Sequence, residues 1–209
     1  MVTQDKPNQS HGSLDPGGWF RRPCAPVNYK RIWIAPVWDH SHRDFDYQHE
    51  PFNNSDDVAA WQRSGFTQHR FTGDVYDMRR AQPPWMSRLQ VILPLQKFSW
   101  SFYRMRPGDV LPNHSDTYAA YRRLHDLDQT AVIRRYVIFL ENWCSGHYFE
   151  IDGVPIVNWI AGDTVLWHGN TEHIAANMGS LPRYTLQITG IIDNDNHPWQ
   201  LQHYNDSIF

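Results

Sequence analysis

The sequence predicts a mainly β protein in which short N-terminal helices and loops precede an antiparallel sandwich or barrel. Three observations predict this class. Strand-like segments recur after residue 97, turn signals separate them, and helix signals come mostly earlier in the chain. The strand-like segments span 98–105, 135–140, 148–151, 155–159, 164–167 and 184–192. Turn signals stand between several of them: RPGD at 106–109, CSG at 144–146, DGV at 152–154 and AGD at 161–163. Regularly spaced strands with such turns are typical of sandwiches and barrels.

The part of the chain before residue 97 is expected to support this core. Ser55 can cap a short helix that Gly65 ends, and a proline pair before Trp85 is typical of the start of a second helix. We therefore expect one domain over 1–209, divided into an irregular arm at 1–30, helical and loop support at 31–96, the β core at 97–192 and a tail at 193–209.

Composition limits the classes of function. The 209 residues are 41% hydrophobic and 14% aromatic, which indicates a packed globular protein. A formal charge of −3, with no long basic block, gives no reason to expect nucleic acid as the main partner. Two cysteines cannot build a disulfide framework, so a reducing, cytoplasmic location is expected. No apolar run is long enough to predict a membrane span.

His114 and Asp116, in LPNHSDTY at 111–118, are the first candidates for chemistry. On an extended strand, residues two apart project from the same face, so an imidazole and a carboxylate would point together. His173, in NTEHIAAN, follows a predicted strand and is the candidate third ligand, with His168 as its rival. Two imidazoles and one carboxylate on one side of a metal ion leave its other positions open, as in non-haem Fe(II) oxygenases.

Arg183 opens the last predicted strand, RYTLQITG. Alternation places Arg183 and Thr185 on the same face as Gln187 and Thr189. Polar groups on an interior face need partners, and a polar pocket inside a barrel would supply them. A guanidinium there matches a carboxylate with two parallel hydrogen bonds, and the hydroxyl of Thr185 can add another.

HSD at 114–116, His173, and Arg183 with Thr185 together resemble the HxD…H…R pattern of the iron(II)/2-oxoglutarate-dependent oxygenases. Residues 97–192 also resemble their double-stranded β-helix, a jelly-roll or cupin-like core. They are especially similar to the prolyl-hydroxylase and aspartyl/asparaginyl-hydroxylase-like branches. The resemblance implies Fe(II) held by the three ligands, 2-oxoglutarate held at its far carboxylate by Arg183 and Thr185, and O₂ as oxidant. It further implies hydroxylation of a small molecule or peptide side chain, with 2-oxoglutarate converted to succinate and CO₂.

The same resemblance makes Arg134 and Tyr136 candidate cosubstrate contacts. The aspartyl-hydroxylase-like branch has an RxH motif on an inner strand, and this chain has Arg134-Arg135-Tyr136 there, so Tyr replaces His. Arg134 is thus a rival of Arg183 as anchor. The run Tyr118 to Arg123 predicts either a lid over the substrate mouth or a solvated helix face.

Two alternatives remain open from the sequence. A nucleic-acid demethylase of the same superfamily would usually carry a second arginine after the first, but no Arg or Lys follows Arg183. A non-catalytic, metal-binding cupin-like barrel would share the fold without turnover, although cupins favour a His-x-His pair where this chain has His114 and Asp116. The sequence carries no signal for an oligomeric state.

Overall fold

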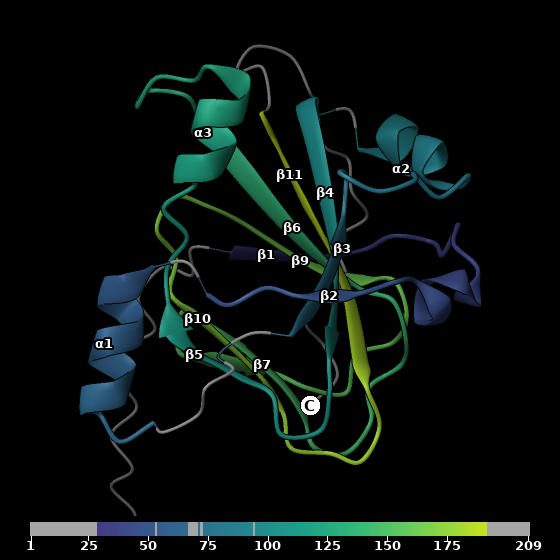
Figure 1. Ribbon diagram of the computed structural model, residues 1–209. Helices are drawn as coiled ribbons and strands as arrows, with labels where there is room; N and C mark the ends of the chain where they lie inside the picture. Colours follow the sequence, from purple (N-terminus) through teal and green to yellow (C-terminus); the bar gives the residue numbers. More distant parts are fainter. Residues whose placement is uncertain (1–28, 53, 67–70, 72, 94, 192–209) are drawn as a thin grey trace, which may run out of the picture.

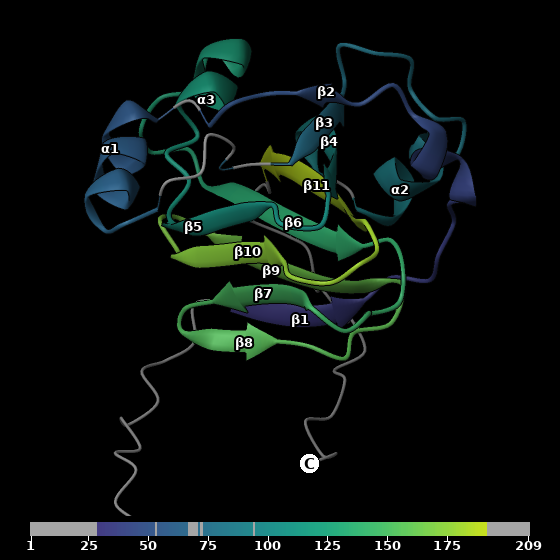
Figure 2. The ribbon, with the colours of Figure 1, turned by 60° about the horizontal axis from the view of Figure 1, so that its bottom comes forward.

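The computed structural model describes residues 29–191, apart from residues 53, 67–70, 72 and 94 and the side chain of His168. The expected arm, almost to its end, and the expected tail lie outside the described residues. Within the described part, the strands form two antiparallel sheets that face each other (Figure 1, Figure 2). The larger sheet has the order β1-β9-β6-β11-β4-β3-β2, and the smaller has the order β5-β10-β7-β8.

The strands of the larger sheet are β1 Tyr29–Trp33, β9 Asp163–His168, β6 Ile133–Phe139, β11 Arg183–Ile191, β4 Gln96–Met105, β3 Asp74–Asp77 and β2 Gln48–His49. Those of the smaller sheet are β5 Val110–His114, β10 His173–Asn177, β7 His147–Ile151 and β8 Val154–Ile156. The helices are η1 His40–Asp44, a 3₁₀ turn, and α1 Ser55–Arg63, α2 Met86–Ile92 and α3 Ala119–His125.

The predicted fold class is confirmed: the protein is mainly β, with two antiparallel sheets in a cupin-like or jelly-roll arrangement and short helices at its periphery. The part of the chain expected to support the core also supplies β1, β2 and β3 to the larger sheet, and β1 overlaps the short strand that Ile32, Trp33 and Ile34 suggest. β1 adds to the sheet edge beside β9, whereas β2 and β3 extend the opposite edge beyond β4.

The larger sheet is buried on both faces. One face, toward α2 and η1, carries a core that includes Trp85, Phe102, Tyr136 and Leu186. The other faces the smaller sheet and carries a second core. Because side chains alternate along a strand, neighbouring residues of β6 and β11 enter different cores. The interior between the sheets is therefore lined by Val137 and Phe139 of β6 and by the odd-numbered residues at the start of β11.

α1 and α3 lie outside the two sheets, on the same side of the molecule (Figure 2). α1 is capped by Asn54, whose side chain accepts hydrogen bonds from the backbone of Asp56 and Asp57, so the prediction of Ser55 as the cap is wrong by one residue. Both residue types can cap, and only Asn54 has the extended backbone that a cap requires. No helix among the described residues is long and apolar enough to cross a membrane.

Candidate metal centre

Two antiparallel strands of the smaller sheet place His114 and His173 directly opposite each other. The two imidazole centroids are 4.1 Å apart, and Asp116 follows β5 by two residues. One potential ligand atom from each of these three side chains lies within 4.8 Å of the other two. The structure thus brings together His114, Asp116 and His173, which form a group that could hold a metal ion.

Backbone carbonyls orient both imidazoles. Nδ1 of His114 lies 2.8 Å from the carbonyl oxygen of Pro112, and Nδ1 of His173 lies 3.1 Å from that of Thr171. Because a carbonyl oxygen only accepts, each Nδ1 carries the hydrogen and each Nε2 keeps its lone pair. A ligand histidine held in this way by its other nitrogen is the usual arrangement at metal sites.

The electrostatics of the triad favour the protonation states that a cation needs. Burial lowers the pKa of His173 to about 4, and burial likewise lowers the pKa of His114. Burial alone would raise the pKa of Asp116, but Arg135 and the two imidazoles outweigh it and hold that pKa below its ordinary value. At neutral pH the group therefore presents two neutral imidazoles and a carboxylate, which need lose no proton to bind a metal.

Aromatic rings enclose the two histidines. Phe52 and Trp61 pack their ring edges against His114, at centroid distances of 5.1 and 6.0 Å. The ring centroid of Trp167 lies 4.9 Å from that of His173. Trp61 belongs to α1 and its indole donates to the carbonyl of Asn113, which fixes this helix beside β5. Aromatic rings therefore cover the two imidazoles of the triad.

Arg183 lies in the same interior and has no acidic partner among the described residues. Its side chain is 4% exposed and is surrounded by the rings of Phe139, Phe149 and Trp159, with centroids 5.8–6.0 Å from the guanidinium carbon. One Nη donates to the carbonyl of Tyr148, at 3.0 Å, whereas Nε makes no hydrogen bond. Burial lowers its pKa to about 9, so the group is still charged at neutral pH.

Phe149 connects the arginine to the triad. Its ring centroid lies 5.8 Å from the guanidinium carbon of Arg183 and 6.3 Å from the ring centroid of His173. A buried, incompletely hydrogen-bonded cation and the three candidate ligands therefore line one continuous interior. Thr185, two residues further along β11, is buried on the same face as Arg183.

The structure places Arg134 and Tyr136 away from this interior. Tyr136 is buried in the core on the other face of the larger sheet, against α2. Arg134 shares its side of β6 by alternation. Neither residue therefore points toward the triad.

Arg135, between them, is the interior residue that the sequence reasoning missed. Its Nη2 lies 3.2 Å from Oδ2 of Asp116, and its Nη1 donates to the side-chain oxygen of Gln187. Its guanidinium also stacks over Tyr118 at 5.2 Å. The parity of Val137 and Phe139, which enter the interior, is the signal that identifies it.

Other polar side chains near these strands have structural partners of their own. His147 faces the carbonyl of Leu181 at 3.0 Å, and His125 faces the hydroxyl of Ser99 at 3.0 Å. The side chain of His168, the rival ligand, lies outside the described residues. Asn177 is wholly buried and donates to the backbone of Met105 and Leu181, which is a structural role.

A second group of potential ligands lies on the other side of the larger sheet. It consists of His40, His42 and Glu141, with ligand atoms again within 4.8 Å of one another. Glu141 already accepts a hydrogen bond from Arg43 and lies 3.1 Å from His42. This cluster holds η1 against the end of β6.

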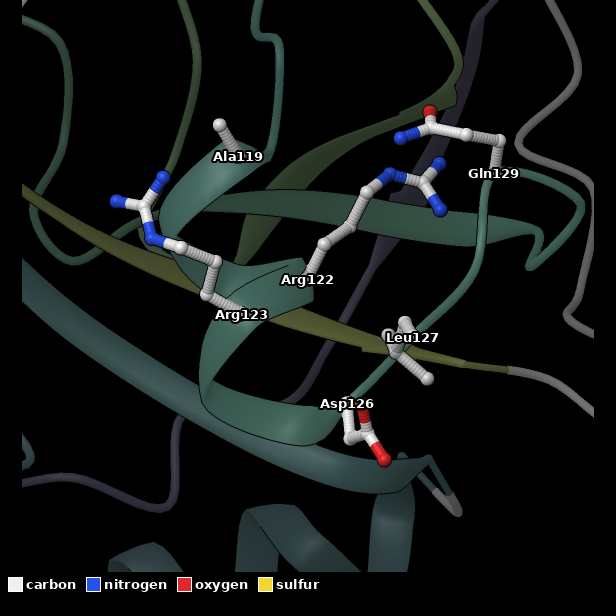
Figure 3. A pocket seen from close by; sticks show the side chains of 6 residues that line it. All are labelled: Ala119, Arg122, Arg123, Asp126, Leu127 and Gln129. Carbon is white, nitrogen blue, oxygen red and sulfur yellow. The ribbon is translucent and has the colours of Figure 1, made fainter.

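A surface hollow beside α3 is a separate feature (Figure 3). Its lining residues are Ala119, Arg122, Arg123, Asp126, Leu127 and Gln129. Arg122 donates to the backbone carbonyls of Asp128 and Ala131, so its guanidinium holds the α3–β6 connection in place. The hollow contains none of the triad residues.

Comparison with known proteins agrees with the fold. A prolyl-4-hydroxylase from Pseudomonas putida is similar with a TM-score of 0.51 and 14% identity, over 80% of this chain and 94% of that chain. KdgF from a Halomonas species gives a TM-score of 0.39 and 10% identity, over 78% of this chain and 96% of that one. A cupin protein from Bacteroides fragilis gives 0.35 and 17%, over 55% and 82%. No protein-family profile and no curated protein matches the sequence. Likeness at such identities defines the fold alone.

Proposed function

We propose that this protein is an Fe(II)- and 2-oxoglutarate-dependent dioxygenase that hydroxylates an amino acid or a peptide side chain. The observation that supports this most is the pairing, in one interior, of a His/Asp/His group with a buried arginine that has no acidic partner among the described residues. Either feature alone could have a purely structural role. Together they match a divalent cation and a carboxylate-bearing cosubstrate.

The donor set fits Fe(II). Two imidazole nitrogens and one carboxylate oxygen form the facial ligand set typical of non-haem iron oxygenases, and the hydrogen bonds to Pro112 and Thr171 leave both Nε2 atoms available. When bound there, Fe(II) would supply the O₂ chemistry that no side chain in the chain can provide. His114, Asp116 and His173 would hold the ion.

Arg183 fits the far carboxylate of 2-oxoglutarate. A guanidinium buried among three aromatic rings is costly unless an anion compensates it, and its free Nε is a donor ready for one. Thr185 lies on the same face of β11 and supports the same end. The surrounding rings exclude water, which strengthens the pairing of the two charges.

The proposed hydroxylation divides the two atoms of O₂ between the substrate and 2-oxoglutarate. One oxygen atom of O₂ enters the substrate as a hydroxyl group in place of a hydrogen. The other enters the carboxylate of succinate, which forms as 2-oxoglutarate loses CO₂. In this reaction Arg183 orients the cosubstrate, and the aromatic walls formed by Trp61, Phe149 and Trp167 restrict water.

Turnover of 2-oxoglutarate tests the proposal. Purified protein with Fe(II), ascorbate and 2-oxoglutarate is expected to form succinate slowly even without substrate. The double variant His114→Ala, Asp116→Ala should form none, while the matched surface variant His40→Ala should retain the rate. Metal binding without any succinate formation in the unaltered protein would favour the non-catalytic barrel instead.

A further inference from the structure

The buried interior contains more positive than negative charge. Arg135 and Arg183 are cations, Asp116 is an anion 3.2 Å from Arg135, and the imidazoles of His114 and His173 carry no negative charge. The described ionisable groups that line this region therefore leave one positive charge in excess. Burial of an uncompensated charge is strongly unfavourable, so the excess indicates a missing anion.

The ligands of the proposed function do not supply this anion. A divalent cation adds two positive charges, and the two carboxylates of 2-oxoglutarate remove two. One positive charge remains, and it lies at Arg135, because Arg183 is the group that fits the cosubstrate. A cation bound to Asp116 would also share the carboxylate charge that now neutralises Arg135.

Unpartnered polar atoms gather at the same place. Three buried donors have no hydrogen bond of good geometry: Nε of Arg135, the hydroxyl of Tyr118 and Nε1 of Trp167. The phenol oxygen of Tyr118 interacts weakly with Arg135 and Trp167, and Oδ2 of Asp116, 3.2 Å from Nη2 of Arg135, also lacks a well-formed hydrogen bond. Trp167 is the direct cross-strand neighbour of Arg135, and the guanidinium of Arg135 lies over the ring of Tyr118. Buried donors without well-formed hydrogen bonds are uncommon in folded proteins, and three that converge on one place suit an anionic acceptor.

The backbone at Tyr118 is strained in a way that supports a site. Its φ of 55° lies in the left-handed region, which a bulky aromatic residue rarely adopts. The residue lies between Asp116 and α3 and is buried. Such strain usually persists where function requires a particular side-chain position.

The Arg135 end of the interior is the more accessible one. Arg135 and Asp116 are partly exposed, whereas Arg183 is buried. α3 lies over the start of β6, which carries Arg135 (Figure 1). A cosubstrate at Arg183 would thus lie deep, and a second ligand would enter beside Arg135.

We propose that Arg135, with Tyr118 and Trp167, binds a carboxylate group of the substrate beside the metal centre. The substrate class is thereby a carboxylate-bearing compound: a free amino acid held by its α-carboxylate, or an acidic side chain of a peptide. This inference rests on the proposed function and specifies the substrate that the same site accepts.

A panel of acids and their amides tests the inference. Succinate formation above the uncoupled rate is measured in the Fe(II)- and 2-oxoglutarate-loaded protein with free L-amino acids, the same amino acids as C-terminal amides, and blocked peptides that contain Asp or Glu. We expect at least one acid to exceed its amide about tenfold or more in kcat/KM. Response to free acids alone identifies the α-carboxylate, and response to blocked acidic peptides identifies the side-chain carboxylate.

Arg135→Gln should lower kcat/KM for the responding acid by about 10- to 100-fold and for its amide far less, and Arg135→Lys should restore part of the discrimination. Tyr118→Phe removes only a hydroxyl and should lower the acid rate by about 2- to 10-fold. Tyr121→Phe is the matched control, because its hydroxyl donates to the carbonyl of Lys97 outside the interior, and it should leave the discrimination unchanged.

Several results would overturn the inference. The first is that no acid exceeds its amide in kcat/KM, which includes the case in which neither compound responds. The second is that Arg135→Gln lowers kcat/KM equally for the acid and the amide, which would make Arg135 only a positioning residue for Asp116. The third is that Arg135→Gln weakens 2-oxoglutarate binding alone. Should Arg135→Gln fail to fold, an unchanged acid preference in Tyr118→Phe decides against it. Binding of Fe(II) and 2-oxoglutarate, measured on the same unaltered sample, separates the two proposals: absence of both contradicts the proposed function, whereas intact binding without acid preference contradicts this inference alone.

Discussion

Two clusters of histidine and carboxylate side chains lie on opposite sides of the larger sheet, and the same geometric test selects both. They differ in what their ligand atoms already contact. In the His40, His42 and Glu141 cluster, both ring nitrogens of the wholly buried His42 face oxygen atoms, and Glu141 also pairs with Arg43. In the triad, each histidine commits only Nδ1, and Nε2 has no hydrogen-bond partner among the described residues.

Proximity of ligand atoms is therefore a weak criterion for a metal site. A cluster whose atoms satisfy one another stabilises the fold, because binding a cation would first require those contacts to break. In the triad, Asp116 also pairs with an arginine, Arg135, but the two Nε2 atoms keep lone pairs that a ligand can use. On this criterion the triad is the candidate metal centre and the second cluster is a structural clamp.

Acidification of the metal-free protein should give the largest effect. The pKa of His173 is about 4 in the folded protein against an ordinary value of 6.5, so the unfolded chain takes up the proton first. The contribution of neutral His173 to the free energy of unfolding is complete above about pH 6.5. As the pH falls toward 4, the free energy of unfolding decreases by about 3 kcal/mol. Unfolding in denaturant across this range checks it. His173→Gln should show a shallower pH dependence, and an equal slope in both proteins would contradict the assignment.

Removal of the Arg183 guanidinium should weaken cosubstrate binding. Loss of charge-assisted hydrogen bonds costs about 1.5–3 kcal/mol, which is about a 10- to 150-fold rise in the dissociation constant of 2-oxoglutarate. Arg183→Ala is compared with Arg134→Ala in anaerobic titration calorimetry. Because Arg134 lies on the face of β6 away from the interior, its variant should bind normally. A large effect of Arg134→Ala instead would make it the anchor that the sequence motif suggested.

His42→Ala should destabilise the protein and leave metal binding intact. The variant loses a buried ring that packs edge-on against Tyr184 and two polar contacts, at a cost of about 1–3 kcal/mol. His40→Ala, at an exposed neighbour in the same cluster, should change stability by less than about 0.5 kcal/mol. Thermal unfolding with and without added Fe(II) measures both, and loss of metal-dependent stabilisation in His42→Ala would refute the clamp.

Much of the fold and part of the site could be predicted from the sequence. Strands such as β9 and β11 are bounded by turn residues and alternate in character, and the ligand spacing at His114 and Asp116 follows from strand geometry. β2 and β3, at one end of the larger sheet, have no such pattern in the sequence. They are short, and the larger sheet supplies their pairing.

The position of Arg135 shows where sequence reasoning failed. Both faces of β6 are buried, so its run of apolar residues does not reveal which face looks into the interior. An analogy with a family motif then selected Arg134 and Tyr136, which have the opposite parity. The burial of His42 could not be predicted from the sequence for a related reason. Its loop is polar, and the residue is buried by contact with Glu141, which is far away in the chain.

Anaerobic equilibrium binding of Fe(II) tests the central distinction most directly. We expect one tightly bound ion per chain in the unaltered protein and in His40→Ala, and loss of that ion in His173→Ala. Retention of the ion in His173→Ala, or its loss in His40→Ala, would contradict the assignment of the metal centre to His114, Asp116 and His173.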